Sequence, residues 1–489
     1  MAIEQEYCGA RGRNYFKEDQ LSQKLLKEIL PENSQAETFE RLEKFGELCG
    51  GKIASLVEAA HQDGKYATLK KYDRWGKRID KVLYCPEQLE ARRLALKAGV
   101  LPPTPLIERM TMAYLLNQNG EGGITCPLAM TDGLADLLEE RGSGEQKQKY
   151  LPLLRDPATQ TPLTGGQFVT EQQGGSNVSE NETLAEEAPD GTWRLTGLKW
   201  FCSNPGELWV TTAKPKGSSH VGLFLMPRRL PGGELNEAHI LRLKDLSGTR
   251  GKATAEIEYR GARAEMIGRP LQGISILLSS VLKTSRIHVA AASLGFIRRA
   301  YWEAKLYSEQ RVNLGRPIGE FPNVKGALYA MENVLETSSK AFFAMLKMLN
   351  TGHPVAEILV PLLKIQLSES ATWTVRQARL IFAGNATLRD FSILPRLAED
   401  ALIQEIWEGT HPILAGHATK ALCRQPARDA FLGLLTDEMV EPLHGAIEEF
   451  YQSKPERKAE RATMMATTAY AAFAEALNQG KVAKALQAS

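Results

Sequence analysis

Two short stretches of this chain combine residue types that can do chemistry. The first runs from Thr170 to Asn177 and reads Thr-Glu-Gln-Gln-Gly-Gly-Ser-Asn after an apolar run. Hydroxyls and small residues at a strand end offer O–H and backbone N–H donors to an anionic or polar-edged ligand. An ordinary polar hairpin loop has the same composition, because Gly-Gly-Ser marks turns in many proteins. By themselves these residues leave both interpretations open.

The second stretch is Ile406-Trp407-Glu408-Gly409-Thr410, near the C-terminal end. Glu408 follows an apolar pair and precedes a glycine that is expected to end a helix. A carboxylate held against a tryptophan is partly desolvated, which favours the chemistry of a general base near neutral pH. A solvent-facing glutamate at a helix C-terminus gives the same pattern, and the residues Trp-Glu-Gly alone favour that simpler interpretation.

Composition limits the class of protein. The 489 residues are 43% hydrophobic and 24% charged, and the net charge of +2 gives no overall attraction to nucleic acid or anionic membranes. The six cysteines stand singly and the eight histidines show no ligand spacing, so we expect reduced thiols, no metal site and a cytoplasmic location. No run of about 18 apolar residues predicts a membrane span, and the N-terminus lacks the apolar core of a signal peptide.

Hydrophobic periodicity predicts the elements that must position the two stretches. Helical spacing fills the chain from Asn14 to about Ala158 and returns after Pro270, whereas short alternating runs occupy the residues between. The chain is therefore expected to have an α+β fold in three parts. They are an N-terminal helical domain (1–158), a central antiparallel β domain or small barrel (159–272) and a C-terminal helical bundle (273–489).

Within these parts we expect individual elements at definite places. Strands are expected at 193–200, 208–212, 221–226 and 253–259, and long helices at 274–307, 321–349, 357–383 and 398–417. The charged, aromatic segment from Tyr72 to Asp80 lacks helical periodicity. It fits a solvated loop, a subunit contact or a loop on the substrate side.

Both stretches belong to a set of motifs that resembles the acyl-CoA dehydrogenase family. Val169 to Val178 is similar to the family's "TEPxAGSD" signature, and Lys199-Trp200-Phe201-Cys202-Ser203 is similar to its second flavin motif, "KxWIT". The Lys-Trp-Phe-x-Ser form is closest to the AidB-like branch. Ser308 to Phe321 resembles "ERxxFGxPIxxxQ", and Ile381-Phe382-Ala383-Gly384-Asn385 resembles "IFGGNG". These motifs stand in family order between about residues 100 and 420, so the resemblance implies the acyl-CoA dehydrogenase-like fold and FAD as cofactor.

The resemblance also assigns roles to individual residues. Trp407-Glu408-Gly409-Thr410 matches the "YEGT" or "WEGT" in which many family members place the catalytic base, which would be Glu408. Other members carry the glutamate on an earlier helix before an arginine, where this chain has Ser285 before Arg286. The cofactor-binding residues implied by the motifs are Val169, Thr170, Gly175, Ser176, Phe201, Ser203, Arg311, Gly384, Trp407 and Thr410.

The chain departs from the family pattern at several motif positions. Pro322 and Pro412 stand where the family has side chains that donate hydrogen bonds, and Asn177 and Ser203 replace the commoner Asp and Thr. We therefore expect FAD to bind with a contact or two missing or replaced, for example by His411.

The resemblance implies α,β-dehydrogenation of an acyl-CoA thioester with hydride transfer to the flavin N5. It further implies an electron acceptor such as an electron-transfer flavoprotein, and a homodimer or homotetramer. Two alternatives remain: an AidB-like flavin protein of the stress response that associates with DNA, and a flavin oxidase. A DNA-binding arm should be basic, but residues 420–489 hold nine Lys and Arg against nine Asp and Glu.

Overall fold

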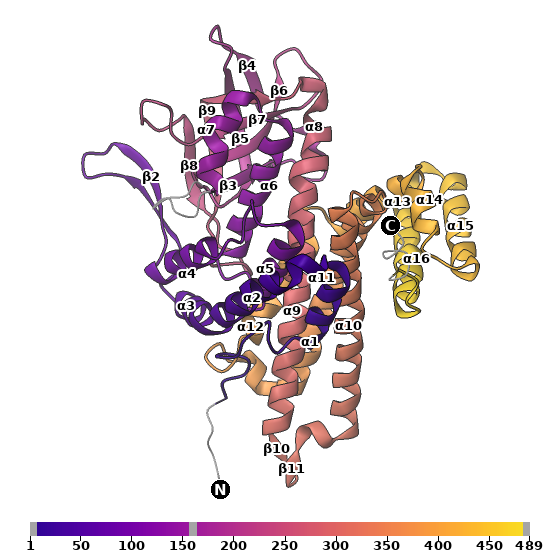
Figure 1. Cartoon of the computed structure of the whole chain (residues 1–489). Coiled ribbons are helices and arrows are strands. Elements are labelled where there is room, and N and C mark those ends of the chain that lie inside the picture. The colour runs from indigo at the N-terminus through magenta and orange to yellow at the C-terminus, as the bar shows by residue number, and fades with distance from the viewer. Residues whose placement is uncertain (1–6, 156–163, 483–489) are drawn as a thin grey trace. The chain divides into compact units, whose positions relative to one another are not determined.

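A computed structural model of the chain describes residues 7–155 and 164–482 (Figure 1). The described chain forms two compact units. One contains residues 55–105 and 121–285, and the other contains residues up to 54, 106–120 and those from 286 onward. The expected boundary between residues 158 and 159 lies outside the described residues, and the three-part division stays a prediction.

The first unit is built around a β-barrel. Its seven-stranded sheet consists of β3 (Gly165–Phe168), β4 (Leu184–Glu187), β5 (Trp193–Ser203), β6 (Leu208–Pro215), β7 (Gly222–Pro227), β8 (Ala238–Leu243) and β9 (Thr254–Ile267). Strands β6, β4, β5, β9 and β7 pair in that order, and β7 pairs back to β6, which closes the barrel. The expected strands are present and form the small barrel, most of whose pairs are antiparallel; β3 and β4 differ from the expectation because both run parallel to β6.

Alternation along β6 shows how the sequence fixes the two faces of this sheet. Leu208 and Val210 join a hydrophobic cluster with α6 (Thr125–Arg141) and α7 (Gly144–Arg155), while Trp209 and Ala213 point into the other cluster. Successive side chains on a strand face opposite sides, so one strand serves both cores. The helices at α8 (Gly273–Ile276) and the π-helical turn Leu277–Val281 complete the outer cluster.

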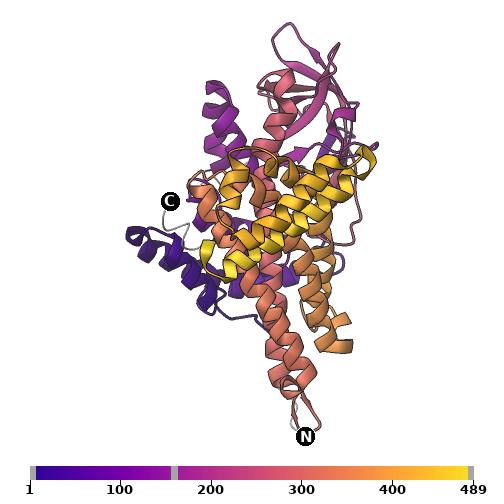
Figure 2. The same ribbon diagram turned by 90° about the vertical axis from the view of Figure 1, so that its right-hand side faces the viewer.

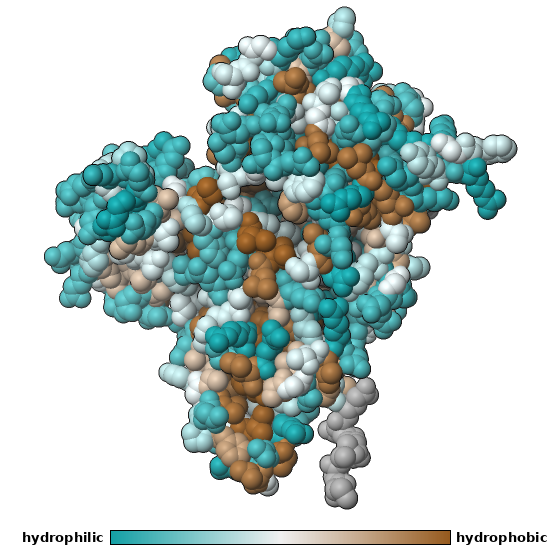
Figure 3. All heavy atoms as spheres, turned by 180° about the vertical axis from the view of Figure 1, so that it is seen from behind, coloured by the Kyte–Doolittle hydropathy of each residue, from teal (hydrophilic) through white to brown (hydrophobic). Residues whose placement is uncertain are grey.

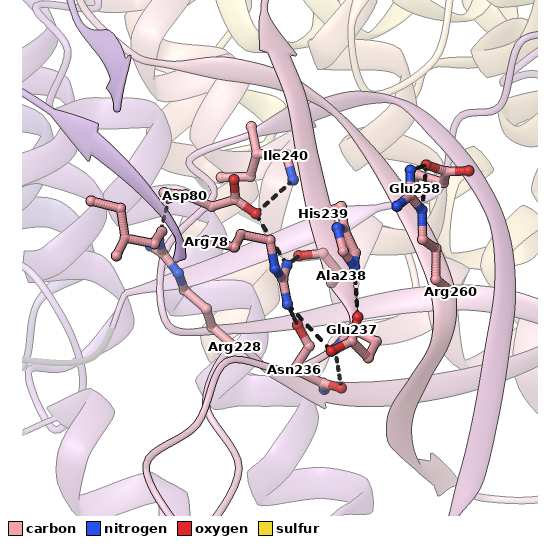
Figure 4. Close-up of polar contacts among 11 residues, drawn as sticks. Arg78, Asp80, Arg228, Asn236, Glu237, Ala238, His239, Ile240, Glu258 and Arg260 are labelled. Carbon is pink, nitrogen blue, oxygen red and sulfur yellow. Dashed lines mark hydrogen bonds and ion pairs between the residues drawn. The ribbon is translucent and has the colours of Figure 1, made fainter. Parts of the chain in front are cut away.

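The charged segment near Tyr72 is a two-stranded hairpin of β1 (Thr68–Tyr72) and β2 (Arg78–Leu83), between α3 (Ala54–Ala60) and α4 (Pro86–Lys97). Asp80 anchors its base and is 2% exposed. The carboxylate accepts hydrogen bonds from the Arg78 guanidinium (3.1 Å) and from the backbone N–H of Ile240 on β8 (3.3 Å), and Arg228 donates to the Asp80 carbonyl (Figure 4). The hairpin is thus fixed to the barrel rather than loosely solvated.

The second unit is helical. Its N-terminal helices are α1 (Gln20–Ile29), α2 (Glu32–Leu48) and α5 (Leu106–Asn117), with a π-helical turn at Cys49–Ile53. Its long helices are α9 (Leu282–Gln310), which belongs to this unit from residue 286, α10 (Pro322–Asn350) and α11 (Ala356–Phe382). A short hairpin of β10 (Val312–Asn313) and β11 (Arg316–Pro317) joins α9 to α10. Nearly continuous burial of apolar residues along α9 and α11 explains their weak one-face patterns.

The chain ends in a group of shorter helices. They are α12 (Leu394–Ile406), α13 (His411–Leu422), α14 (Ala427–Leu432), α15 (Asp437–Gln452) and α16 (Lys458–Asn478), and Figure 2 shows the last three in yellow beside the long helices. The expected single helix from 398 to 417 is therefore wrong, because it is divided between α12 and α13. In the described part of the chain, no helix is both long enough and apolar enough to cross a membrane.

The hairpin anchor gives a stability prediction. We expect Asp80→Asn to lower the free energy of unfolding of the barrel unit by about 2–4 kcal/mol, because it removes one charge of a buried pair. Asparagine is suitable since residue 80 has a φ of 43°, which asparagine tolerates. Urea unfolding, together with hydrogen exchange of the hairpin amides, measures the loss.

Glu186→Gln provides the matched control. Glu186 pairs with Lys216 at 2.7 Å, but the two side chains are 57% and 76% exposed, so the loss should stay below about 1 kcal/mol. Equal losses for the two variants would contradict the anchoring role of Asp80.

Candidate active site

In the barrel unit, a buried ion pair organises the first stretch. Glu171 follows β3 and is 3% exposed, and its carboxylate accepts hydrogen bonds from Lys199 Nζ (2.6 Å), Thr183 Oγ1 (2.7 Å) and the backbone N–H of Glu182 (2.6 Å). Burial by itself would raise the pKa of the Glu171 carboxyl, but the Lys199 ammonium and the surrounding donors lower that pKa below its usual value. The pair ties the loop after β3 to strand β5.

The same contacts bring the two predicted flavin motifs together. The backbone N–H of Trp200 donates to the Thr170 carbonyl at 2.9 Å, so Thr170 lies beside β5. A Cβ atom on Gly175 would lie 2.7 Å from Thr170 Oγ1, so the loop folds back closely on that hydroxyl. Val169 packs against the outer hydrophobic cluster, whereas Ser176 is exposed.

The end of β5 presents an apolar ring beside polar donors. Phe201 is apolar but 47% exposed. The Oγ atom of the half-buried Ser203 lies 3.0 Å from Thr254 Oγ1 and 3.2 Å from Lys252 Nζ. Such a surface fits a flat aromatic group with a polar edge. Lys252 was missed by sequence reasoning, because a single lysine at the start of a strand carries no local signal.

In the helical unit, the predicted residues Arg311 and Gly384 belong to neighbouring segments. The Tyr307 ring near the end of α9 stacks on Phe382 with centroids 4.0 Å apart, and its hydroxyl accepts from Asn385 Nδ2 at 3.0 Å. Arg311 lies one helical turn after Tyr307 and is exposed, and Gly384 has open space where a side chain would stand. An exposed guanidinium near an open glycine turn fits the pyrophosphate or adenine end of a dinucleotide.

Glu408 lies in the turn between α12 and α13. The helix ends at Ile406, and Trp407 is its C-terminal cap, with its indole N–H donating to Gln404 Oε1 at 2.9 Å. Glu408 has a φ of 58° and Gly409 a φ of 111°, and α13 begins after Thr410. Hence Glu408 is not part of a helix; its backbone is left-handed and the residue is half-buried.

Two buried cations hold this turn. Lys364 of α11 is completely buried, and its Nζ donates to the carbonyls of Glu405 and Gly409, each at 2.9 Å. Arg286 of α9 donates from Nε to the Glu408 carbonyl at 3.1 Å. Burial lowers the pKa of Lys364 to about 7 and that of Arg286 to about 10, and the Glu408 carboxylate opposes both shifts. Both cations therefore lie within electrostatic reach of the carboxylate.

Other histidines and hydroxyls around the turn have definite partners. His411 Nδ1 lies 3.0 Å from Glu369 Oε1, and its Nε2 lies 3.2 Å from Ser368 Oγ. Burial, with help from nearby Arg286 and Lys420, lowers the pKa of His417 to about 4, so this imidazole is neutral at neutral pH. In the barrel unit, Ser285, at the alternative base position, is buried and accepts a hydrogen bond from Gln167 Nε2 at 2.7 Å.

The two prolines that depart from the family pattern have a local explanation. Pro322 and Pro412 each stand in the first two positions of a helix, α10 and α13. Proline is well suited there, because its fixed φ fits the first turn and its missing N–H has no helical partner.

Comparison with known proteins agrees with this arrangement. Residues 9–158 match a family described as the adaptive response protein AidB N-terminal domain, 166–262 the acyl-CoA dehydrogenase middle domain, and 272–423 the acyl-CoA dehydrogenase C-terminal domain. Acyl-CoA dehydrogenase family member 11 of Caenorhabditis elegans is 30% identical over 82% of this chain and 69% of its own length. The putative acyl-CoA dehydrogenase AidB of Escherichia coli is also 30% identical, over 64% of this chain and 60% of its own length.

A solved structure gives the same result for the fold. Caenorhabditis elegans ACDH-11 in complex with C11-CoA has a TM-score of 0.86 and 26% identity, covering 99% of this chain and 90% of that one. Family members are oxidoreductases that bind FAD, so the predictions of fold, family and cofactor are confirmed at that level. With barrel, helical bundle and motifs all in agreement, this chain belongs to the acyl-CoA dehydrogenase family and resembles its AidB-like members.

Proposed function

We propose that this protein is an FAD-dependent dehydrogenase that removes hydrogen from the α and β carbons of an acyl-CoA thioester. The observation that carries the proposal is the fixed turn at Glu408, whose carboxylate is half-buried and whose backbone is held by Lys364 and Arg286. A base that must meet one carbon atom needs such a fixed position.

Glu408 acts in this proposal as the general base. Its carboxylate takes the α proton, and its backbone N–H donates to the thioester carbonyl, which stabilises negative charge as the proton leaves. When bound, FAD would provide N5 as the acceptor of the β hydride. Trp407 and Thr410 flank the base and are proposed to contact the flavin.

Further contacts to the cofactor are proposed for the motif residues of the barrel unit. Thr170, Gly175, Ser176 and Ser203 supply backbone and hydroxyl donors, and Phe201 supplies an apolar face. Lys252 supports Ser203 through its hydrogen bond of 3.2 Å to the hydroxyl oxygen. The exposed Arg311 and the Gly384 turn are proposed to contact the flavin of a second subunit.

This assignment implies partners. The C11-CoA complex of the ACDH-11 structure supports an acyl-CoA substrate, and we propose an electron-transfer flavoprotein as electron acceptor and a dimer or tetramer as the assembly. The six cysteines all lie within the described residues and form no disulfide there, and we propose a cytoplasmic location.

A second candidate function is association with nucleic acid. The hairpin from Thr68 to Leu83 carries six Lys and Arg against two Asp, and the Trp75 side chain near its tip is 94% exposed. A basic segment with an exposed aromatic ring fits a phosphate backbone with accessible bases. This local charge contrasts with the balanced C-terminal helices.

The first prediction tests the base. Glu408→Gln keeps shape but cannot accept a proton, so anaerobic bleaching of the flavin by a panel of acyl-CoA thioesters should slow by at least about 10²-fold, with FAD still bound. The rate is measured by stopped-flow absorbance in the flavin band.

Two controls accompany this variant. Glu399→Gln changes a half-buried carboxylate on α12 that pairs with Arg389, and Ser285→Ala changes the alternative base position; both should keep nearly the wild-type rate. Wild-type bleaching by Glu408→Gln would place the base elsewhere. A wild type that no thioester bleaches would contradict the dehydrogenase proposal.

The second prediction concerns the assembly. Near Arg311 and Gly384 four apolar side chains are exposed, namely Val312 (57%), Leu314 (85%), Leu380 (63%) and Leu388 (46%). Figure 3 shows hydrophobic surface over the lower end of the long helices, where β10 and β11 lie in Figure 1. Exposed apolar groups of this kind mark contacts between subunits.

Leu314→Asp combined with Leu380→Asp should therefore raise the dissociation constant of the assembly by at least about 10-fold, since each change places a charge in an apolar contact. Light scattering over a concentration series measures the shift. Met464→Asp, at an exposed position on α16, is the control. A wild-type protein that is monomeric with FAD bound would refute the proposed assembly.

The third prediction decides between the two candidate functions. If the protein is a dehydrogenase without a nucleic-acid role, a labelled duplex should bind it weakly at both 50 and 200 mM salt. Binding through phosphate contacts would instead lose about 10³-fold or more in affinity between these two concentrations. Tight, strongly salt-dependent binding that is lost in Trp75→Ala would establish the second function.

A further inference from the structure

Helix α11 faces the turn at Glu408 with three polar side chains. Lys364, Ser368 and Glu369 follow each other at intervals of four residues and one residue, which places them on neighbouring turns of one helix. Lys364 contacts the carbonyls of Glu405 and Gly409, and the other two contact His411. One helix thus holds the segment before and after the proposed base.

The backbone of the turn needs this external support. A left-handed conformation at a residue with a side chain is unfavourable, and it persists only where the surroundings impose it. Glu408 has a φ of 58°. Three carbonyls of the segment, those of Glu405, Glu408 and Gly409, accept hydrogen bonds from the two buried cations.

The other end of the segment is fixed through His411. The Ser368 hydroxyl donates to the Ile365 carbonyl at 2.8 Å, and its oxygen lies 3.2 Å from His411 Nε2. The Nδ1 atom lies 3.0 Å from the Glu369 carboxylate. Each ring nitrogen therefore has a polar partner on α11, and these two contacts fix the ring at the start of α13.

We propose that Lys364 is a positioning residue that sets the Glu408 carboxylate for proton removal, through its hydrogen bonds to both sides of the left-handed turn. This inference rests on the proposed function of Glu408 as the base. Lys364 itself does not touch substrate in this scheme and acts only through the turn.

Stability alone does not explain a lysine at this position. The pKa of Lys364 in the folded chain, about 7, is below the value of about 10.4 for an unfolded lysine, so its protonated form opposes folding. That opposition is complete below about pH 7 and fades as the pH rises toward the unfolded value. An apolar side chain of similar length would avoid that cost but would remove the donor of the Glu405 and Gly409 carbonyls, so the contribution of the lysine is to place the turn.

The test measures proton removal separately from flavin reduction. An arylacetyl-CoA thioester has α hydrogens but no removable β hydrogen, so exchange of its α hydrogens in D₂O, followed by NMR, reports the base alone. We expect Lys364→Met to fold with FAD bound, to bind the thioester with unchanged affinity, and to exchange at least about 10-fold more slowly, because a small displacement of a base costs that much. Lys364→Arg, which can also donate to two carbonyls, should exchange faster than Lys364→Met.

Controls separate this inference from the function on which it rests. Lys347→Met, which removes a lysine of α10 that donates to the Ile29 carbonyl at 3.4 Å, should exchange at the wild-type rate. Suppose that Glu408→Gln loses exchange. If Lys364→Met then stays within twofold of the wild-type rate, or if Lys364→Arg is no faster than Lys364→Met, Lys364 does not position the base, and the proposed function stands. If Glu408→Gln exchanges normally, the proposed base is wrong and this inference falls with it.

A second variant covers a failure of Lys364→Met to fold. Glu369→Leu removes the acceptor of His411 at a side chain that is 50% exposed, so the fold should tolerate it. If α11 fixes the turn, Glu369→Leu should slow the α-hydrogen exchange by about threefold or more, because catalysis is sensitive to small displacements of the base. An unchanged rate overturns the inference.

Discussion

A buried lysine ammonium group supports both the loop after β3 and the turn at Glu408. In the barrel unit, Lys199 is completely buried against Glu171 and so fixes the loop that begins at Thr170. In the helical unit, Lys364 is completely buried against two carbonyls around Glu408. Both arrangements take a charge out of water, which is costly unless every donor is satisfied.

The two lysines meet that cost in different ways. Lys199 has a carboxylate as partner, so a full ion pair is buried and the surrounding hydroxyls complete it. Lys364 is bonded to backbone carbonyls, and the Glu408 carboxylate acts on it from a distance without a direct bond of the same kind. The first lysine therefore fixes a loop through a buried ion pair, whereas the second fixes a turn through backbone carbonyls.

Local sequence signals predicted most of the fold. Alternation in β5 to β7 and β9, and apolar spacing in α9 to α11, were strong enough to locate these elements. The short strands β3, β4 and β8 were missed, because four to six residues of mixed polarity resemble a loop. The parallel pairing of β3 and β4 with β6 depends on contacts far apart in the chain, and no local pattern encodes it.

The residues of the candidate site also differ in whether the sequence could predict them. The motif residues could be found because a resemblance to a family pointed to them, but the residues that support them could not. Lys364, Lys252 and Glu369 occur singly within helices or at a strand end, where a charged residue normally indicates solvent. Their partners are backbone carbonyls and hydroxyls of distant segments, and only the folded chain shows these contacts.

The break between α12 and α13 shows how such hidden contacts change a local prediction. Apolar spacing continues from residue 398 to 417, and a glycine alone does not require the helix to stop at Ile406. The carbonyls of Glu405, Glu408 and Gly409 instead turn toward Lys364 and Arg286, which replace helical partners for that segment. The two buried cations need hydrogen-bond acceptors, and the carbonyls of the turn supply them. Because these carbonyls bond to side chains and not to helical N–H groups, Glu408 lies outside a helix. The position of Glu408 and the break in the helix are thus linked, because buried cations need hydrogen-bond acceptors and the carbonyls of this turn supply them.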